Sequence, residues 1–210
     1  QKSRSVASHS ICLSPSMPPP HIVLTVLDDL GYHGVGYRNP ALKTPTIDRL
    51  ASHGVKLESF YTAKLCGPSR SSLLTGRAPH TLQASVDNLA HYWFEEGLHA
   101  SYVLLPEALR RRGYDTVGVG KWHCGFSHPS YLPTNRGFSS WFGFLGGCED
   151  HVTQRICGAE PCSAKFPGVG HPIDLHRDGR PALGENGTAD GFSHNCLRFG
   201  AAAVESIERY

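Results

Sequence analysis

The chain has 210 residues, of which 40% are hydrophobic and 18% are charged, and this is enough for one sizeable domain with an apolar core. Its net charge of only +2, with histidine neutral, gives no reason to expect nucleic acid or a membrane surface as a partner. Its apolar runs are too short to span a bilayer, so we expect no transmembrane segment.

Residues 1–20 are predicted to be a flexible N-terminal segment, because four prolines alternate there with serine and basic residues. The segment lacks the apolar centre of a signal peptide. Either a leader has been removed or the chain begins inside its gene. Residues 22–27 follow as a short, nearly continuous apolar run, which is typical of a strand buried on both faces of a parallel sheet.

Helix and strand signals alternate after this run. Thr44-Pro45 is predicted to start a helix that ends at Gly54, and residues 55–61 are predicted to be extended. We then expect a helix after Pro68, a helix from 106 to 113, a strand over 114–119, an irregular loop-rich region over 146–195 and a helix over 195–209. This alternation indicates the α/β class.

Residues 66–77 read Cys-Gly-Pro-Ser-Arg-Ser-Ser-Leu-Leu-Thr-Gly-Arg and carry the strongest functional signal. Cys66 stands where the helix is predicted to start, so it would feel the positive end of the peptide dipoles. Free backbone N–H groups at the same place suit a bound anion. The stretch therefore indicates an activated group that faces an anionic substrate. The alternative is a buried structural cysteine or half of a disulfide.

Two further pairs of residues follow predicted strands. Asp28 and Asp29 come directly after the first strand, where adjacent carboxylates favour a hard cation such as calcium or magnesium, although a solvated turn is the alternative. Lys121 and His123 lie two residues apart on the extended segment that ends the second strand, so both side chains could face one pocket. The alternative for this pair is a surface lysine beside a satisfied histidine.

Together these motifs resemble the type I, formylglycine-dependent sulfatases. The pattern Cys-x-Pro-Ser-Arg and Leu-Thr-Gly-Arg is complete, and Gly-Lys-Trp-His at 120–123 matches a second family motif. Segments 27–32, 42–50 and 132–138 look closest to arylsulfatase B-like members, and the resemblance runs from about residue 21 to residue 143. Ser139 and Cys124 depart from the family pattern, at positions without an assigned role.

The resemblance implies an alkaline-phosphatase-like sandwich, with a mixed, mostly parallel sheet flanked by helices. Residues 21–210 would be a partial catalytic domain whose C-terminal part is missing. The family has a second half-site with an Asp-Asn metal pair, a lysine and a histidine. This chain has no Asp-Asn dipeptide after residue 143 and no lysine beyond Lys165. We therefore expect little or no turnover from the chain alone.

The resemblance also implies roles for the site residues. A formylglycine-generating enzyme would oxidise Cys66 to Cα-formylglycine, whose hydrate would attack sulfur. Arg70 would hold the hydrate and the anionic centre, and Lys121 would contact a sulfate oxygen. His123 would bond the second hydroxyl of the hydrate and take its proton when sulfate leaves.

The metal site implied by the resemblance holds one Ca²⁺, with Asp28, Asp29 and the modified Cys66 as ligands. The reaction would be hydrolysis of a sulfate ester, and the substrate a sulfated small molecule or carbohydrate. The same motifs leave two alternatives open. One is a phosphate or phosphonate ester hydrolase of the same superfamily, and the other is a non-catalytic pseudoenzyme that uses the anion pocket.

With Cys66 set aside, six of the seven cysteines could pair in fifteen ways. Cys157 and Cys162 flank a turn-like tetrapeptide and are our first candidates for a disulfide, with reduced thiols as the alternative. A zinc site is disfavoured because no Cys-x-x-Cys pair occurs. Asn186-Gly187-Thr188 fits the N-glycosylation pattern. We expect a glycoprotein of the secretory pathway, lysosomal or extracellular.

Overall fold

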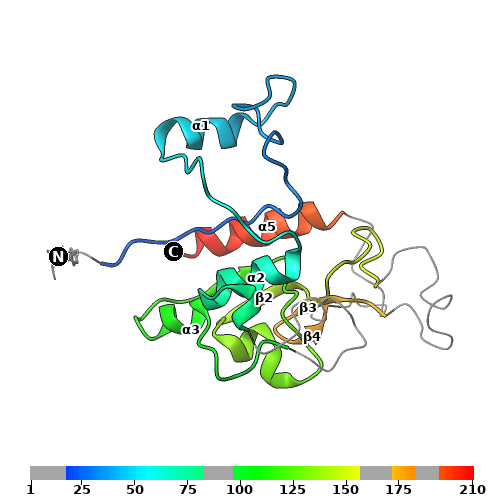
Figure 1. The fold of residues 1–210 in the computed structure, drawn as a ribbon. Coiled ribbons are helices and arrows are strands. Elements are labelled where there is room, and N and C mark those ends of the chain that lie inside the picture. The colour runs from blue at the N-terminus through cyan, green and yellow to red at the C-terminus, as the bar shows by residue number, and fades with distance from the viewer. Residues whose placement is uncertain (1–17, 83–96, 157–171, 183–193) are drawn as a thin grey trace, which may run out of the picture. The chain divides into compact units, whose positions relative to one another are not determined.

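The computed structural model describes residues 18–82, 97–156, 172–182 and 194–210, and Figure 1 shows these parts in colour. The chain divides after His53 into two compact units, which are described one at a time. The predicted flexible segment 1–20 lies almost wholly outside the described residues, and so do the Cys157–Cys162 pair and the glycosylation triplet. Among the described helices, none is long and apolar enough to cross a membrane.

The first unit is organised around helix α1 (Pro45–His53), which confirms the predicted helix. The hydroxyl of Thr44 accepts a hydrogen bond from the backbone N–H of Gly36 at 2.7 Å and donates to Asp48 at 2.9 Å. The same Asp48 carboxylate accepts from the backbone N–H of Tyr37 at 3.1 Å. Thr44 and Asp48 therefore fasten the preceding loop to the first turns of α1.

The predicted strand over 22–27 is wrong. These residues form no strand, and their apolar side chains are exposed, with Val23 at 68% and Ile22 at 59%. A buried strand needs neighbouring strands to bond its backbone, and the described part of the first unit contains none. Residues 55–61 form no strand either, and a turn occupies 58–59.

The second unit is built on a four-stranded sheet in the order β1-β2-β3-β4. The strands are β1 (Val117–Val119), β2 (Ser140–Phe144), β3 (Leu175–Arg177) and β4 (Arg180–Pro181). Strands β1 and β2 are parallel, with Val117 opposite Ser140, whereas the two later pairs are antiparallel. The mixed α/β sheet is confirmed, but the described part has one parallel pair of three.

The expected irregular region 146–195 contains a hairpin, since β3 and β4 both fall inside it. Asp178 and Gly179 connect these two strands with positive φ angles of 51° and 80°, the backbone of a tight two-residue hairpin turn. Asp178 also receives the backbone N–H of Trp141 on its carboxylate at 2.7 Å, which ties the turn to β2. The region expected to be irregular and loop-rich thus contains this regular hairpin within its described residues 172–182.

The predicted helices of the second unit are confirmed. They are α2 (Cys66–Thr75), α3 (Leu105–Arg110) and α5 (Asn195–Glu208), with short 3-10 turns at Pro79–Thr81, Pro129–Tyr131 and Pro133–Arg136. Gly76, with φ 67°, ends α2. The three helices flank the sheet (Figure 1).

Alternation along β2 explains how helices come to cover both faces of the sheet. Trp141 points to one face and packs at 5.6 Å, ring to ring, against Trp122 in the main core, which Leu74 of α2 also contacts. Phe142 and Phe144 point to the other face, where Phe199 of α5 lies 5.7 and 6.3 Å away. The result is a helix–sheet–helix sandwich.

A buried arginine, Arg136, links segments beside the core through its hydrogen bonds. Arg136 is 2% exposed and donates to the carbonyl oxygens of Leu98 and Tyr102, at 2.5 and 2.8 Å. Its Nε atom lies 3.3 Å from the carboxylate of Glu107, whose other oxygen accepts the N–H of Leu104 at the start of α3. Arg136 thus joins three separate segments.

The backbone of β2 lies close to the residue that follows β1, at Gly143 and Gly120. Gly120 donates its N–H to the carbonyl oxygen of Phe142 at 2.9 Å. A Cβ atom added at Gly143 would overlap the carbonyl oxygen of Gly120. Glycine at 143 is therefore a condition for the two segments to lie this close.

Gly143→Ala is expected to destabilise the chain by about 3 kcal/mol or more, because the backbone atoms that it meets are fixed in the sheet. The matched control is Gly200→Ala in α5, where an added Cβ would meet nothing within 4 Å and should stabilise the helix by about 0.5–1 kcal/mol. Thermal unfolding of both variants measures the difference. Equal melting temperatures would contradict the close packing.

Candidate active site

Cys66 is the first residue of α2, as its sequence context predicts. The preceding residue, Leu65, provides no side-chain cap, and the first turn of α2 holds no acidic residue. Backbone N–H groups at the start of the helix, together with the helix dipole, therefore favour a negative charge beside Cys66. The side chain is half-buried. It thus lies at a helix terminus suited to an anion.

Arg70, one turn further along α2, links this helix to the segment after β1. Its Nη1 atom donates to the carbonyl oxygen of Lys121 at 2.6 Å. Both residues are half-buried. The structure therefore brings three of the predicted site residues, Cys66, Arg70 and Lys121, into one connected part of the second unit.

A backbone ladder fixes the positions of Lys121 and His123. Beyond β1, the N–H groups of Trp122 and His123 donate to the carbonyl oxygens of Phe144 and Leu145, at 2.9 and 3.0 Å. The strand itself ends at Val119, and Gly120 and His123 have φ angles of 102° and 57°. The alternation rule used to predict that Lys121 and His123 face the same way therefore does not apply here. Bonding to β2 sets both positions instead.

His123 is 2% exposed and has the left-handed backbone conformation, which is unusual for a residue other than glycine. Such outliers persist only where surrounding contacts hold them, and they gather at functional sites. Here the held residue lies next to Cys124, also buried, whose thiol meets Ser71 of α2.

Positive charge converges on this part of the unit. Burial raises the pKa of the Cys124 thiol to about 12, while the charges of Arg70, Arg136 and Lys121 act in the opposite direction. Those three cations are therefore near enough to Cys124 to favour negative charge on its sulfur. An anion would be stabilised there.

Asp28 and Asp29 belong to the first unit, where they form an exposed turn directly after residues 22–27. Asp29 has φ 53°, the second left-handed conformation among the predicted site residues. Two adjacent carboxylates are hard donors and fit part of a calcium shell, which takes about six to eight oxygens. Among the described residues, no group of three or more His, Cys, Asp or Glu side chains could hold a metal.

One supporting residue escaped the sequence reasoning. Asp174, 2% exposed, accepts the backbone N–H groups of Leu145 and Gly146 on its two carboxylate oxygens, at 3.1 and 2.9 Å. Leu145 is the residue whose carbonyl oxygen receives His123. The only signal in the sequence is an aspartate between the apolar residues Ile173 and Leu175, and this does not predict which groups it bonds.

Comparison with known proteins gives a consistent result. The sequence profile described as Sulfatase matches residues 20–166. Arylsulfatase J of Mus musculus is 42% identical over 140 residues, covering 66% of this chain and 23% of that protein. N-acetylgalactosamine-6-sulfatase of Rattus norvegicus is 44% identical over 135 residues, covering 60% of this chain and 25% of that protein. The chain thus spans about a quarter of the length of these relatives.

Two solved structures resemble the fold of this chain. The crystal structure of Ps i-CgsB superposes with a TM-score of 0.71 at 28% identity, covering 87% of this chain and 40% of that one. A second crystal structure, Ps i-CgsB in complex with k-i-k-neocarrahexaose, gives a TM-score of 0.53 at 26% identity, over 68% of this chain and 30% of that one.

The raised pKa of Cys124 predicts an inert thiol. At pH 8 its thiolate is scarce because the pKa is about 12, and burial keeps reagents away. Iodoacetamide should label exposed Cys196 and leave Cys124 unlabelled until denaturant is added. Peptide mass spectrometry measures both sites. Equal labelling of Cys124 and Cys196 in the folded chain would contradict this packing.

Proposed function

This chain belongs to the sulfatase family, and from that premise we propose that it carries the nucleophile side of an active site that hydrolyses sulfate esters. The observation that carries the proposal is the bond from Arg70 to the carbonyl oxygen of Lys121. It joins the helix start that holds Cys66 to the segment that holds Lys121 and His123. A tetrahedral anion beside Cys66 would therefore meet two cations and a helix terminus.

Each residue has a distinct role in this proposal. Arg70 uses one N–H to hold the backbone, so its guanidinium stays in a defined orientation while its charge favours the sulfate group. Lys121 adds a point charge from the opposite segment. His123 would exchange a proton with the nucleophile, in an orientation held by the ladder to Leu145.

Two groups would complete the chemistry. Formylglycine, formed from Cys66 by a formylglycine-generating enzyme, would supply a hydrated aldehyde as the nucleophile. Asp28, Asp29 and the modified Cys66 would hold one Ca²⁺, which would neutralise charge on the sulfate oxygens. The donor set supports this in part, because two adjacent carboxylates suit a hard cation.

We propose that the substrate is a sulfated carbohydrate. One relative is named for a sulfated amino sugar, and one similar structure holds k-i-k-neocarrahexaose. A secretory or lysosomal glycoprotein would fit the Asn186-Gly187-Thr188 triplet. We further propose that residues 21–210 are part of one catalytic domain. The family profile supports this for residues 20–166, and the similarity to the structure of Ps i-CgsB covers 87% of the chain.

The modification is tested on the tryptic peptide from Leu65 to Arg70, after co-expression of the chain with a formylglycine-generating enzyme. Mass spectrometry should show Cys66 with the mass of the aldehyde, and a hydrazide probe should label the chain. Cys66→Ala, expressed in the same way, should remain unlabelled. An intact Cys66 thiol in the co-expressed chain would favour the non-catalytic reading.

Anion binding is tested by sulfate-dependent thermal stability. Lys121→Met removes a charge but keeps the carbonyl oxygen that Arg70 bonds. Sodium sulfate should raise the melting temperature of the wild type by roughly 3–6 °C more than that of Lys121→Met. The control is Lys43→Met, which changes an exposed lysine of the first unit and should respond to sulfate like the wild type. It corrects for the non-specific stabilisation that sulfate gives any folded protein.

Identical sulfate responses of wild type and Lys121→Met would count against the site. Should the site bind as proposed, the converted protein is incubated in excess with a sulfate and a phosphate ester of one phenol. Because little turnover is expected from the chain alone, phenol released in a single turnover separates the two reaction classes. Faster phosphate hydrolysis would replace the sulfatase proposal by the phosphatase alternative.

A further inference from the structure

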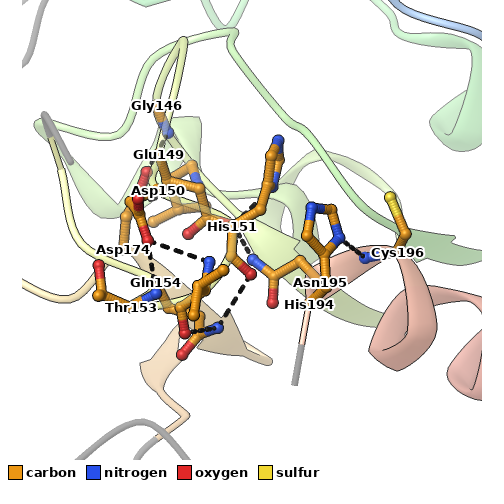
Figure 2. Close-up of polar contacts among 12 residues, drawn as sticks. Gly146, Glu149, Asp150, His151, Thr153, Gln154, Asp174, His194, Asn195 and Cys196 are labelled. Carbon is orange, nitrogen blue, oxygen red and sulfur yellow. Dashed lines mark hydrogen bonds and ion pairs between the residues drawn. The ribbon is translucent and has the colours of Figure 1, made fainter. Parts of the chain in front are cut away.

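A buried carboxyl group lies where the start of α5 meets the turn at 149–154. The side chain of Glu149 is 0% exposed, and Asn195, the first residue of α5, is also 0% exposed. Asn195 donates from Nδ2 to Oε1 of Glu149, and its backbone N–H donates to the carbonyl oxygen of His151 at 2.9 Å. Figure 2 shows the two side chains pointing toward each other.

Two oxygen atoms of this pair lack a hydrogen-bond donor among the described residues. They are Oε2 of Glu149 and Oδ1 of Asn195. An ionised carboxylate and an amide oxygen both only accept hydrogen bonds, so neither can satisfy the other. Leaving two such acceptors buried together is costly, and native structures rarely do so.

The charges around Glu149 do not favour its ionised form. Burial first, and then the carboxylates of Asp174 and Asp150, raise the pKa of Glu149 to about 8, against an ordinary value of 4.5, although the hydrogen bond from Asn195 acts in the opposite direction. Asp150 is held ionised because backbone N–H groups of the same turn lower its pKa. Asp174 is likewise bonded to backbone N–H groups.

The nearby basic groups do not reverse this balance. His151 has its Nδ1 atom 3.9 Å from Oε1 of Glu149, but burial, with His194 and Lys121, lowers the pKa of His151. His194 accepts the N–H of Cys196 on its ring, so in this geometry that nitrogen carries no proton. His176 faces Asp174 at 3.7 Å and bonds the Asp174 backbone carbonyl.

We propose that Glu149 is protonated and forms a carboxylic acid–amide pair with Asn195, and that loss of this proton in alkaline solution releases the first turn of α5. One proton on Oε2 serves both unmatched oxygens, since Oε2–H can donate to Oδ1 while Nδ2 donates to Oε1. The proton passes to solvent when the pair opens. The released segment is the first turn of α5, whose N–H groups at Asn195 and Cys196 bond His151 and His194 in the closed state.

The sign of the pH effect follows from the raised pKa. Between about 4.5 and about 8 the folded chain holds one proton more than the unfolded chain. Stability from the pair is therefore complete below pH 4.5 and is lost as the pH rises through 8. This is opposite to the behaviour of an ordinary ion-paired carboxylate.

Glu149→Gln tests the pair, because an amide at 149 donates and accepts as the protonated acid does, yet cannot ionise. Between pH 6 and pH 9 the wild type should lose at least about 4 °C more in melting temperature than Glu149→Gln. Amide exchange of the 194–200 segment, corrected for pH, should accelerate in the wild type alone. Glu205→Gln, an exposed change on the same helix, should leave the wild-type profile intact.

A direct readout is the ¹³C NMR titration of the Glu149 carboxyl in the 210-residue chain, assigned by its absence in Glu149→Gln. A midpoint near pH 8 supports the pair. A midpoint near the ordinary 4.5, or equal pH profiles for wild type and Glu149→Gln, overturns it. Stabilisation of the wild type but not of Glu149→Gln by calcium chloride at pH 8 would also overturn it, in favour of a bound cation.

Discussion

The arrangement of the second unit depends on the parallel pairing of β1 with β2. Backbone hydrogen bonds continue this pairing beyond the strands, as far as His123 and Leu145. It depends on bare backbone at Gly143, because the carbonyl oxygen of Gly120 occupies the space of a side chain. From this contact Lys121 and His123 take their places, and Arg70 then fixes α2 through the Lys121 carbonyl. Cys66, the proposed nucleophile at the start of α2, is thus positioned by a sheet that this helix does not belong to.

Support for this centre comes from distant parts of the sequence. The carboxylate of Asp174 accepts hydrogen bonds from two backbone N–H groups just after β2 and so holds the end of that strand. Glu149 and Asn195 fasten the start of α5 to the turn that follows β2. Phe199 of α5 packs against Phe142 and Phe144 of β2. Residues without an assigned catalytic role therefore support the geometry of the proposed site.

Local signals predicted the helices well. Pro68 in the first turn and Gly76 just past the end delimit α2, and Thr44-Pro45 starts α1. Strands were harder, because their neighbours are distant. Residues 22–27 have a strand sequence but pair with no strand in the described part of the chain, whereas β2, with Trp141 and Phe142 on opposite faces, was not predicted. The motifs located Cys66, Arg70, Lys121 and His123. They could not reveal Asp174 or the Glu149–Asn195 pair, which only tertiary contacts bring together.

The exposed run at 22–27 affects how the chain behaves in concentrated solution. Its residues favour β structure, and the run contains no charge, glycine or proline that would discourage pairing with another copy. Six such residues with open backbone groups and apolar side chains about half to two-thirds exposed meet the description of an amyloid-forming segment. Self-association through this run would compete with folding during synthesis and refolding. Burial of this run against another surface would therefore also protect the chain from aggregation.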